Sequence, residues 1–440
     1  MKASLMWLIL GATILSSMAS APAQTASPEQ QPAQSQTQPH ELKVTDYTLP
    51  RDKLAKAKAL YETSTVLYLF GVVFGIAMLW ALLQLRVAPF FRDLAERASE
   101  KRFAQTLIFV PLLMLLIAVI LLPMDVYTHH ISRQYGLSVQ DWGSWVGDWL
   151  KGQTLSLVVT ILAIFGLFWV IRKSPRRWWF YFWLLTLPFI VLIIFIAPVI
   201  LDPMFNTFVP LEKTEPQLVT ALQQVTARGG LQIPADRMFE MKASEKVTTY
   251  NAYVTGIGAT KRVVVWDNAA RDMTISETIF VFGHEMGHYV LNHIYKGLAF
   301  FAALAFAGFW VGRTIVVAMM ARWGEGWRLR GIDDLAALPV FLLTLTLLSL
   351  VSQPFASAFS RHLEHQADIY GLEVIHGMIP NSAEVAASAF QRLGEKSYDY
   401  PAPSRFLVFW SYDHPTIKDR IQFALHYDPW NTPSGPKYVK

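Results

Sequence analysis

The chain has 440 residues, of which 53% are hydrophobic and only 16% are charged. Soluble globular proteins carry about 25% charged residues, so this composition, with a mean hydropathy of +0.31, indicates a membrane protein. The absence of cysteine excludes disulfides and thiolate metal sites, and a net charge of +5 without basic runs does not suggest nucleic-acid binding.

The first 23 residues have the features of a targeting segment. Lys2 precedes a short apolar run over residues 5–18, and Ala21 to Ala23 offers small residues for cleavage. The run is short for a bilayer crossing, which needs about 20 residues. We therefore expect a cleaved signal peptide, with an uncleaved anchor as the alternative. Residues 24–41 are rich in Gln, Pro, Ser and Ala and predict a flexible linker.

Six apolar segments are long enough, or nearly so, to cross a bilayer. Their approximate bounds are 65–87, 107–122, 155–171, 178–197, 297–321 and 335–357. Arginine and lysine gather in the links after the first, third and fifth segments, which the positive-inside rule places in the cytoplasm. Residues 24–64, the loop 124–154 and the polar region after the fourth segment then face outside. We expect a multi-pass protein of a bacterial-type inner membrane.

The composition becomes that of a soluble domain between residues 199 and 296. Residues 215–228 predict an amphipathic helix, and residues 246–255 and 261–266 predict two strands of a hairpin. A strand beside a protease cleft can pair with an extended peptide through main-chain hydrogen bonds. The alternative is an ordinary hairpin that packs on the following helix.

An HExxH motif, His-Glu-Met-Gly-His, occupies residues 284–288. Positions i and i+4 share a helix face, so His284 and His288 direct two imidazoles at one point, as a Zn²⁺ site requires. Glu285 is not a ligand, but it can act as general base on a water at the same ion. Thr274 and Glu277 have the spacing of a capping box and predict the start of this helix. The alternative is a paired cluster on a solvated helix face.

A catalytic zinc needs a third protein ligand, for which Glu364 is the candidate. Glu364 and Asp368 are again four residues apart and share a helix face, so Asp368 can accept the outer N–H of a ligating histidine. Two membrane segments separate Glu364 from the histidines, and an even number of crossings returns the chain to the same side. The alternative is a surface helix in which Arg361 pairs with Glu364.

HExxH followed by the pattern SRxxExxAD at residues 360–368 resembles the membrane-embedded zinc metallopeptidases of the type I CAAX prenyl protease family. The resemblance covers roughly residue 60 to the C-terminus and includes residues 198–206, 251–253 with 261–267, and His414-Pro415 with Arg420. It implies one zinc ion per chain and a substrate-binding strand that carries Asn251. It also implies His414 as donor to the developing oxyanion and Arg420 as support for substrate or carboxylate binding.

The predicted fold is mainly α, a polytopic α-helical membrane barrel with a zincin-like α+β metalloprotease domain. By resemblance, the helices surround a large chamber that the zinc domain closes at one end. The predicted divisions are a signal peptide or short anchor (1–23), a linker and lead-in helix (24–64), four transmembrane helices (65–198), a zinc domain with the substrate strand and HExxH helix (199–296), two transmembrane helices (297–357), and the third-ligand helix with the C-terminal catalytic segment (358–440).

The expected function is that of a membrane-integral zinc metalloendopeptidase, similar to CAAX prenyl endopeptidases, which acts on peptide or protein substrates that are lipidated or membrane-associated. One alternative is a housekeeping protease of misfolded membrane proteins. Another is a non-enzymatic, zinc-stabilised scaffold, which Glu285 argues against because a structural zinc site needs no base. Five further histidines match no ligand role, and most of them are expected to serve packing or the surface: His293, His362, His365, His376 and His426.

Overall fold

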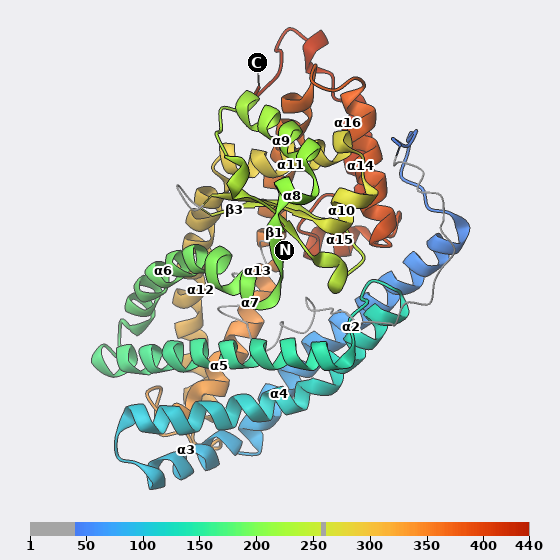
Figure 1. The fold of residues 1–440 in the computed structure, drawn as a ribbon. Coiled ribbons are helices and arrows are strands. Elements are labelled where there is room, and N and C mark those ends of the chain that lie inside the picture. Colours follow the sequence, from blue (N-terminus) through green and yellow to red (C-terminus); the bar gives the residue numbers. More distant parts are fainter. Residues whose placement is uncertain (1–39, 257–260, 440) are drawn as a thin grey trace.

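The computed structural model describes residues 40–256 and 261–439. The predicted signal peptide and nearly all of the linker lie outside the described residues, as does most of the predicted hairpin turn. Figure 1 shows long helices in one part of the molecule and a small sheet with shorter helices gathered at one end of them.

Six long helices correspond to the six predicted membrane segments, and all are long and apolar enough to cross a membrane. In the most apolar windows of the fourth and fifth of these helices only 11% of the residues are buried, which leaves an apolar outer surface for lipid. The six are α2 (Arg51–Gln84), α4 (Arg102–Gln134), α5 (Trp142–Lys173), α6 (Trp178–Ile196), α12 (His293–Trp323) and α13 (Leu338–Ile375).

Several of these helices are longer than the apolar segments. α2 includes the predicted lead-in helix, and most of the predicted loop 124–154 is helical because α4 and α5 both extend into it. The two extensions pack together, with Trp149 Nε1 donating to Asp125 Oδ2 at 3.0 Å. α13 runs without a break through the division predicted at residue 357, so one helix carries both a membrane span and Glu364.

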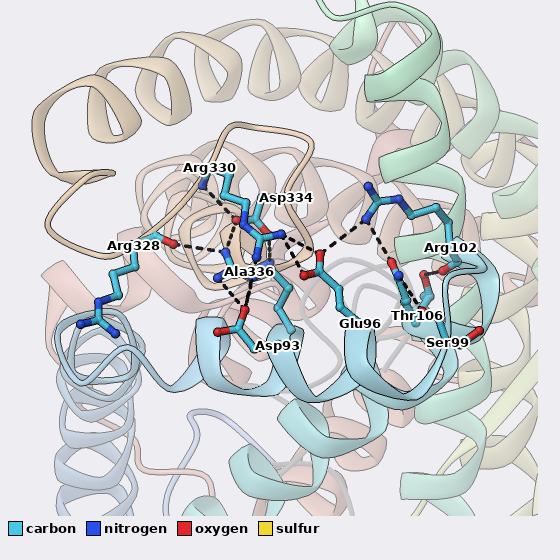
Figure 2. A network of polar contacts seen from close by, with 11 residues as sticks. Asp93, Glu96, Ser99, Arg102, Thr106, Arg328, Arg330, Asp334 and Ala336 are labelled. Atoms are coloured by element: carbon cyan, nitrogen blue, oxygen red, sulfur yellow. Dashed lines mark hydrogen bonds and ion pairs between the residues drawn. The ribbon is translucent and has the colours of Figure 1, made fainter.

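A polar network fastens the helices at the end far from the sheet (Figure 2). It joins α3 (Val87–Ala98) to the link between α12 and α13. Arg92 Nη1 lies 2.6 Å from Asp334 Oδ2, and these side chains are only 6% and 3% exposed. Arg330 forms a second ion pair with Glu96 at 2.7 Å. Asp334 also caps the short turn of residues 335–337 that leads into α13, because its Oδ1 accepts the N–H of Ala336 at 3.0 Å.

The sheet has the strand order β1-β2-β4-β3. Its strands are β1 (Phe208–Pro210), β2 (Met238–Met241), β3 (Ala252–Thr255) and β4 (Arg262–Trp266). β3 pairs antiparallel with β4, as the hairpin prediction requires, and it forms one edge of the sheet. The strand predicted from residue 246 is wrong over its first half. Val139 N donates to the carbonyl of Lys246 at 3.3 Å, and Thr248 Oγ1 donates to the carbonyl of Gly136 at 2.8 Å, so this stretch is bound to the α4–α5 link instead. The side chain of Lys246 pairs with Asp148 near the start of α5.

The helices around the sheet include α9 (Pro216–Arg228), close to its predicted bounds, and α11 (Ile275–Val290), which carries HExxH. The predicted capping box is confirmed: Glu277 N donates to Thr274 Oγ1 at 3.1 Å, and Thr274 N donates to Glu277 Oε2 at 2.8 Å. The C-terminal helices are α14 (Ser382–Lys396), α15 (Arg405–Ser411) and α16 (Ile417–His426). Short elements complete the described chain: η2 (Ala197–Leu201), α7 (Asp202–Phe205), α8 (Leu211–Thr214), η3 (Ala235–Arg237), η4 (Ala243–Glu245), α10 (Asp267–Asp272), η6 (Leu335–Ala337) and η7 (Pro429–Asn431).

The segment before α2 lies against this same domain. Leu42 N donates to Ser388 Oγ at 2.7 Å, and the buried Tyr47 donates through its hydroxyl to the carbonyl of Asp399 at 2.8 Å. Together with the Lys246–Asp148 pair, these contacts bring the start of α2, the α4–α5 link and the sheet to one end of the helices. The sequence predicted that these three regions lie on the same side of the membrane, because successive segments cross it in alternating directions, and the grouping agrees with that prediction.

Glycines let α11 and α13 approach closely. A Cβ atom on Gly287 would lie 2.9 Å from Tyr370 Cβ and 3.2 Å from Ala367 Cα. One on Gly371 would lie 3.0 Å from the backbone nitrogen of His284. The neighbouring atoms are backbone or Cβ atoms, which a rotamer change cannot move. The short distance between these helices is therefore possible only because Gly287 and Gly371 have no side chain.

We predict that Gly287→Ala forces α11 and α13 apart and lowers the free energy of unfolding by about 1–3 kcal/mol, the usual cost of overpacking. Denaturant titration of the purified protein in detergent measures this. Gly308→Ala on α12 is the control, because its Cβ would meet nothing within 4 Å. Equal stability of the two variants would contradict the prediction.

Candidate metal centre

The two histidines of HExxH lie side by side on α11. His284 Nε2 and His288 Nε2 are 3.2 Å apart, and both side chains are buried. Metal-ligating atoms of His284, Glu285 and His288 all lie within 4.8 Å of one another. The predicted helix face is therefore formed, with the carboxylate of Glu285 beside the two rings.

Glu364 reaches this point from α13. Its Oε2 lies 3.1 Å from His284 Nε2, and its Oε1 lies 3.3 Å from His288 Nε2. Oε2 is buried, and among the described residues no group forms a hydrogen bond to it. The carboxylate of Glu364 and the two imidazole nitrogens therefore lie together. The sequence predicted that two membrane crossings return the chain to the side of the histidines, and this position agrees with it.

These three side chains fit a zinc ion. Ligand atoms bound to a tetrahedral Zn²⁺ at about 2.0–2.2 Å lie about 3.3 Å from one another. The separations of 3.2, 3.1 and 3.3 Å match that spacing. Two imidazole nitrogens with one carboxylate oxygen are also a ligand set that catalytic zinc sites use.

A buried ion pair lies behind His284. Asp368 Oδ1 is 2.8 Å from His284 Nδ1, where the sequence predicted it. Arg420 on α16 holds Asp368 with two hydrogen bonds, from Nε at 3.0 Å and from Nη2 at 2.6 Å. Burial by itself lowers the pKa of His284, but the Asp368 and Glu364 carboxylates outweigh it and raise the pKa to about 9. The negative charge of these two carboxylates favours a proton on the ring, and it would equally favour a metal cation bound beside it.

The resemblance implied that Arg420 supports substrate or carboxylate binding. The carboxylate that its guanidinium binds belongs to Asp368 of the same chain, and the side chain is buried against the ring of Phe390 at 4.2 Å. Arg420 therefore lies behind the candidate ligands. Sequence spacing does not reveal this, because α16 is far from α13 along the chain.

His414 follows α15 and approaches the cluster from its open side. Its Nε2 lies 3.3 Å from Glu364 Oε2, and its Nδ1 lies 2.9 Å from Asp413 Oδ1. The side chain is 43% exposed, whereas that of Glu364 is 10% exposed. His414 therefore lies at the solvent-exposed edge of the group of candidate ligands.

Asn251 directly precedes β3, which packs against α11 at the edge of the sheet. Its carbonyl accepts the N–H of Trp266 at 3.0 Å and continues the β3–β4 pairing. An edge strand in this position can accept another extended chain through its outer backbone groups.

His293, which the sequence analysis expected to serve packing or the surface, lies against His288. The two Nδ1 atoms are 3.1 Å apart, and His293 is buried. The sequence feature next to His293 is Asn292, which adopts a left-handed backbone at φ 58°. Asparagine tolerates this conformation better than most residue types, so it is a sequence signal for a turn at this point. Asn292 lies in the short turn that joins α11 to α12 and directly precedes His293.

Comparison with known proteins gives the same assignment over nearly the whole chain. Residues 30–207 match the family model described as CAAX prenyl protease N-terminal, five membrane helices, and residues 212–428 match peptidase family M48. A Bacillus subtilis protein named uncharacterized metalloprotease YhfN is 36% identical over 372 residues, which are 84% of this chain and 85% of that protein. The human CAAX prenyl protease 1 homolog is 23% identical over 421 residues, covering 86% of this chain and 84% of that protein.

The crystal structure of Saccharomyces mikatae Ste24p has the same fold, with a TM-score of 0.73 at 23% identity, over 86% of this chain and 89% of that one. The predicted fold class is confirmed by this match and by the six membrane-length helices beside a small sheet. The chain therefore belongs to peptidase family M48, among the type I CAAX prenyl proteases, and is a membrane-integral metalloendopeptidase of a family whose metal is typically zinc.

Proposed function

We propose that this chain hydrolyses peptide bonds with one Zn²⁺ held by His284, His288 and Glu364. The observation that supports this most strongly is that the two imidazole nitrogens lie 3.2 Å apart and each lies 3.1–3.3 Å from an oxygen of Glu364, which comes from a helix far away in the sequence. A bound ion would supply Lewis-acid chemistry, which makes a water acidic enough to lose a proton near neutral pH.

Glu285 is the proposed general base. It follows a ligand directly on α11 and belongs to the same cluster of donor atoms within 4.8 Å. Its carboxylate takes the proton of the attacking water and then delivers it to the leaving amine. His414, on the open side of the cluster, donates to the oxygen of the substrate carbonyl as negative charge develops there.

Asp368 and Arg420 are proposed to position His284. Because Asp368 accepts at Nδ1, the hydrogen of the ring stays there and Nε2 is left bare to bind an ion. Arg420 compensates the buried charge of Asp368 with a pair of hydrogen bonds. We propose this positioning role for Arg420 beside the support for substrate or carboxylate binding that the resemblance implied.

The proposed substrate is a peptide or protein segment in an extended conformation, held along β3 with Asn251 at the start of the binding strand. Relatives named CAAX prenyl proteases suggest substrates close to the membrane, with or without an attached lipid. The alternative of clearing misfolded membrane proteins uses the same chemistry. Cleavage rates of one peptide sequence with and without a lipid anchor would separate these substrate classes. A non-enzymatic scaffold is not favoured.

We predict that Glu285→Gln lowers the cleavage rate by about 10²–10⁴-fold, since it removes proton transfer, while zinc stays bound. The measurements are hydrolysis of a quenched fluorescent peptide and zinc content per purified chain. Glu212→Gln, at an exposed carboxylate in the same domain, is the control and should cleave normally. Cleavage by Glu285→Gln at the wild-type rate would refute the assignment of the base.

The basic links predict that the metal centre lies outside the cytoplasm. Because the chain has no cysteine, single cysteines can report sidedness without background. In intact cells, a membrane-impermeant maleimide should label Glu212→Cys in the metal domain, whereas Lys101→Cys in a basic link should react only after the cells are opened. The reverse labelling pattern would place the centre in the cytoplasm.

A further inference from the structure

His293 touches the candidate centre from behind, and the proposed mechanism gives it no part. It is the first residue of α12 and is only 4% exposed. Its Nδ1 lies 3.1 Å from His288 Nδ1, while His288 Nε2 faces Glu364 at 3.3 Å. The other nitrogen of His293, Nε2, lies 3.0 Å from Gln366 Oε1 on α13. His293 thus bridges the back of His288 to the helix that carries Glu364.

We propose that His293 is a positioning residue, which accepts the Nδ1–H of His288 and so holds Nε2 of that ring toward the metal. The proposal rests on the metal site described above. It assigns His293 a part in metal affinity, with no contact to the ion or to substrate.

If His288 binds an ion through Nε2, one arrangement of hydrogens satisfies the contacts of His293 and Gln366 named here. A histidine that binds an ion through Nε2 carries its hydrogen on Nδ1, so His288 donates. His293 then accepts at Nδ1, carries its own hydrogen on Nε2 and donates to Gln366 Oε1. The amide nitrogen of Gln366 is left to donate to His362 Nε2, which lies 2.9 Å away. Lys296 Nζ, at 3.5 Å from Gln366 Oε1, also faces the oxygen end of the amide.

The two ligand histidines are therefore supported differently. His284 is backed by the charged pair of Asp368 and Arg420, whereas His288 is backed by the neutral side chains of His293 and Gln366. Arg420 and a bound divalent ion would already balance the carboxylates of the site. A further carboxylate behind His288 would add an uncompensated buried charge, which is costly. A neutral acceptor orients the ring without that cost.

The test compares two substitutions in the full-length protein in detergent. His293→Asn places an amide oxygen near the position of Nδ1 and keeps the acceptor, while His293→Leu removes it. The dissociation constant for Zn²⁺ is measured by competition with a chromophoric chelator, and the Co²⁺-substituted protein gives a ligand-field spectrum. Neither readout needs turnover. We expect His293→Leu to weaken zinc binding about 10–100-fold and to alter the Co²⁺ spectrum, and His293→Asn to stay within about threefold of wild type.

His129→Leu is the matched control, because His129 is equally buried, at 1% exposed, but lies on α4. It should leave zinc affinity unchanged. If His293→Leu does not fold, Gln366→Leu carries the same test, since it removes the acceptor that fixes His293, and it should also weaken zinc binding. Wild-type affinity in the leucine variant tested, or equal weakening in His293→Leu and His293→Asn, would overturn the proposal. Failure of the proposed function would look different: the wild-type protein would then bind no stoichiometric zinc.

Discussion

The structure depends above all on the close contact between α11 and α13. α11 supplies the histidine pair, and α13 supplies Glu364 after the chain has crossed the membrane region twice. Gly287 on α11 and Gly371 on α13 allow the two backbones to approach until the donor atoms are 3.1–3.3 Å apart. A carboxylate has a short reach, so this backbone separation decides whether a three-ligand centre can exist.

The second constraint is electrostatic. Glu364 and Asp368 bring two carboxylates into a buried region, and an isolated buried charge is strongly unfavourable. Arg420 compensates Asp368 directly, and the histidine nitrogens face Glu364. This arrangement explains why a positive charge is favoured at His284 and why the point between the three donors suits a divalent cation. The same helices thus determine both the geometry and the charge of the centre.

Much of this could be predicted from the sequence because the relevant rules are local. The spacing of His284 and His288 determines a shared helix face, and Thr274 with Glu277 determines where that helix starts. Counting membrane crossings was enough to return Glu364 to the correct side. The rest depends on tertiary contacts. Which carboxylate Arg420 meets depends on the packing of α16 on α14. The strand predicted from Lys246 is lost because the backbone of this stretch bonds to the distant link between α4 and α5, where Val139 N donates to the Lys246 carbonyl.

The zinc-edge anomalous difference density of crystals of the full-length protein tests the central claim most directly. The account predicts one strong peak per chain, about 2.0–2.2 Å from His284 Nε2, His288 Nε2 and a carboxylate oxygen of Glu364. A peak bound by the two histidines with Glu364 turned away, or no peak between α11 and α13, would contradict it.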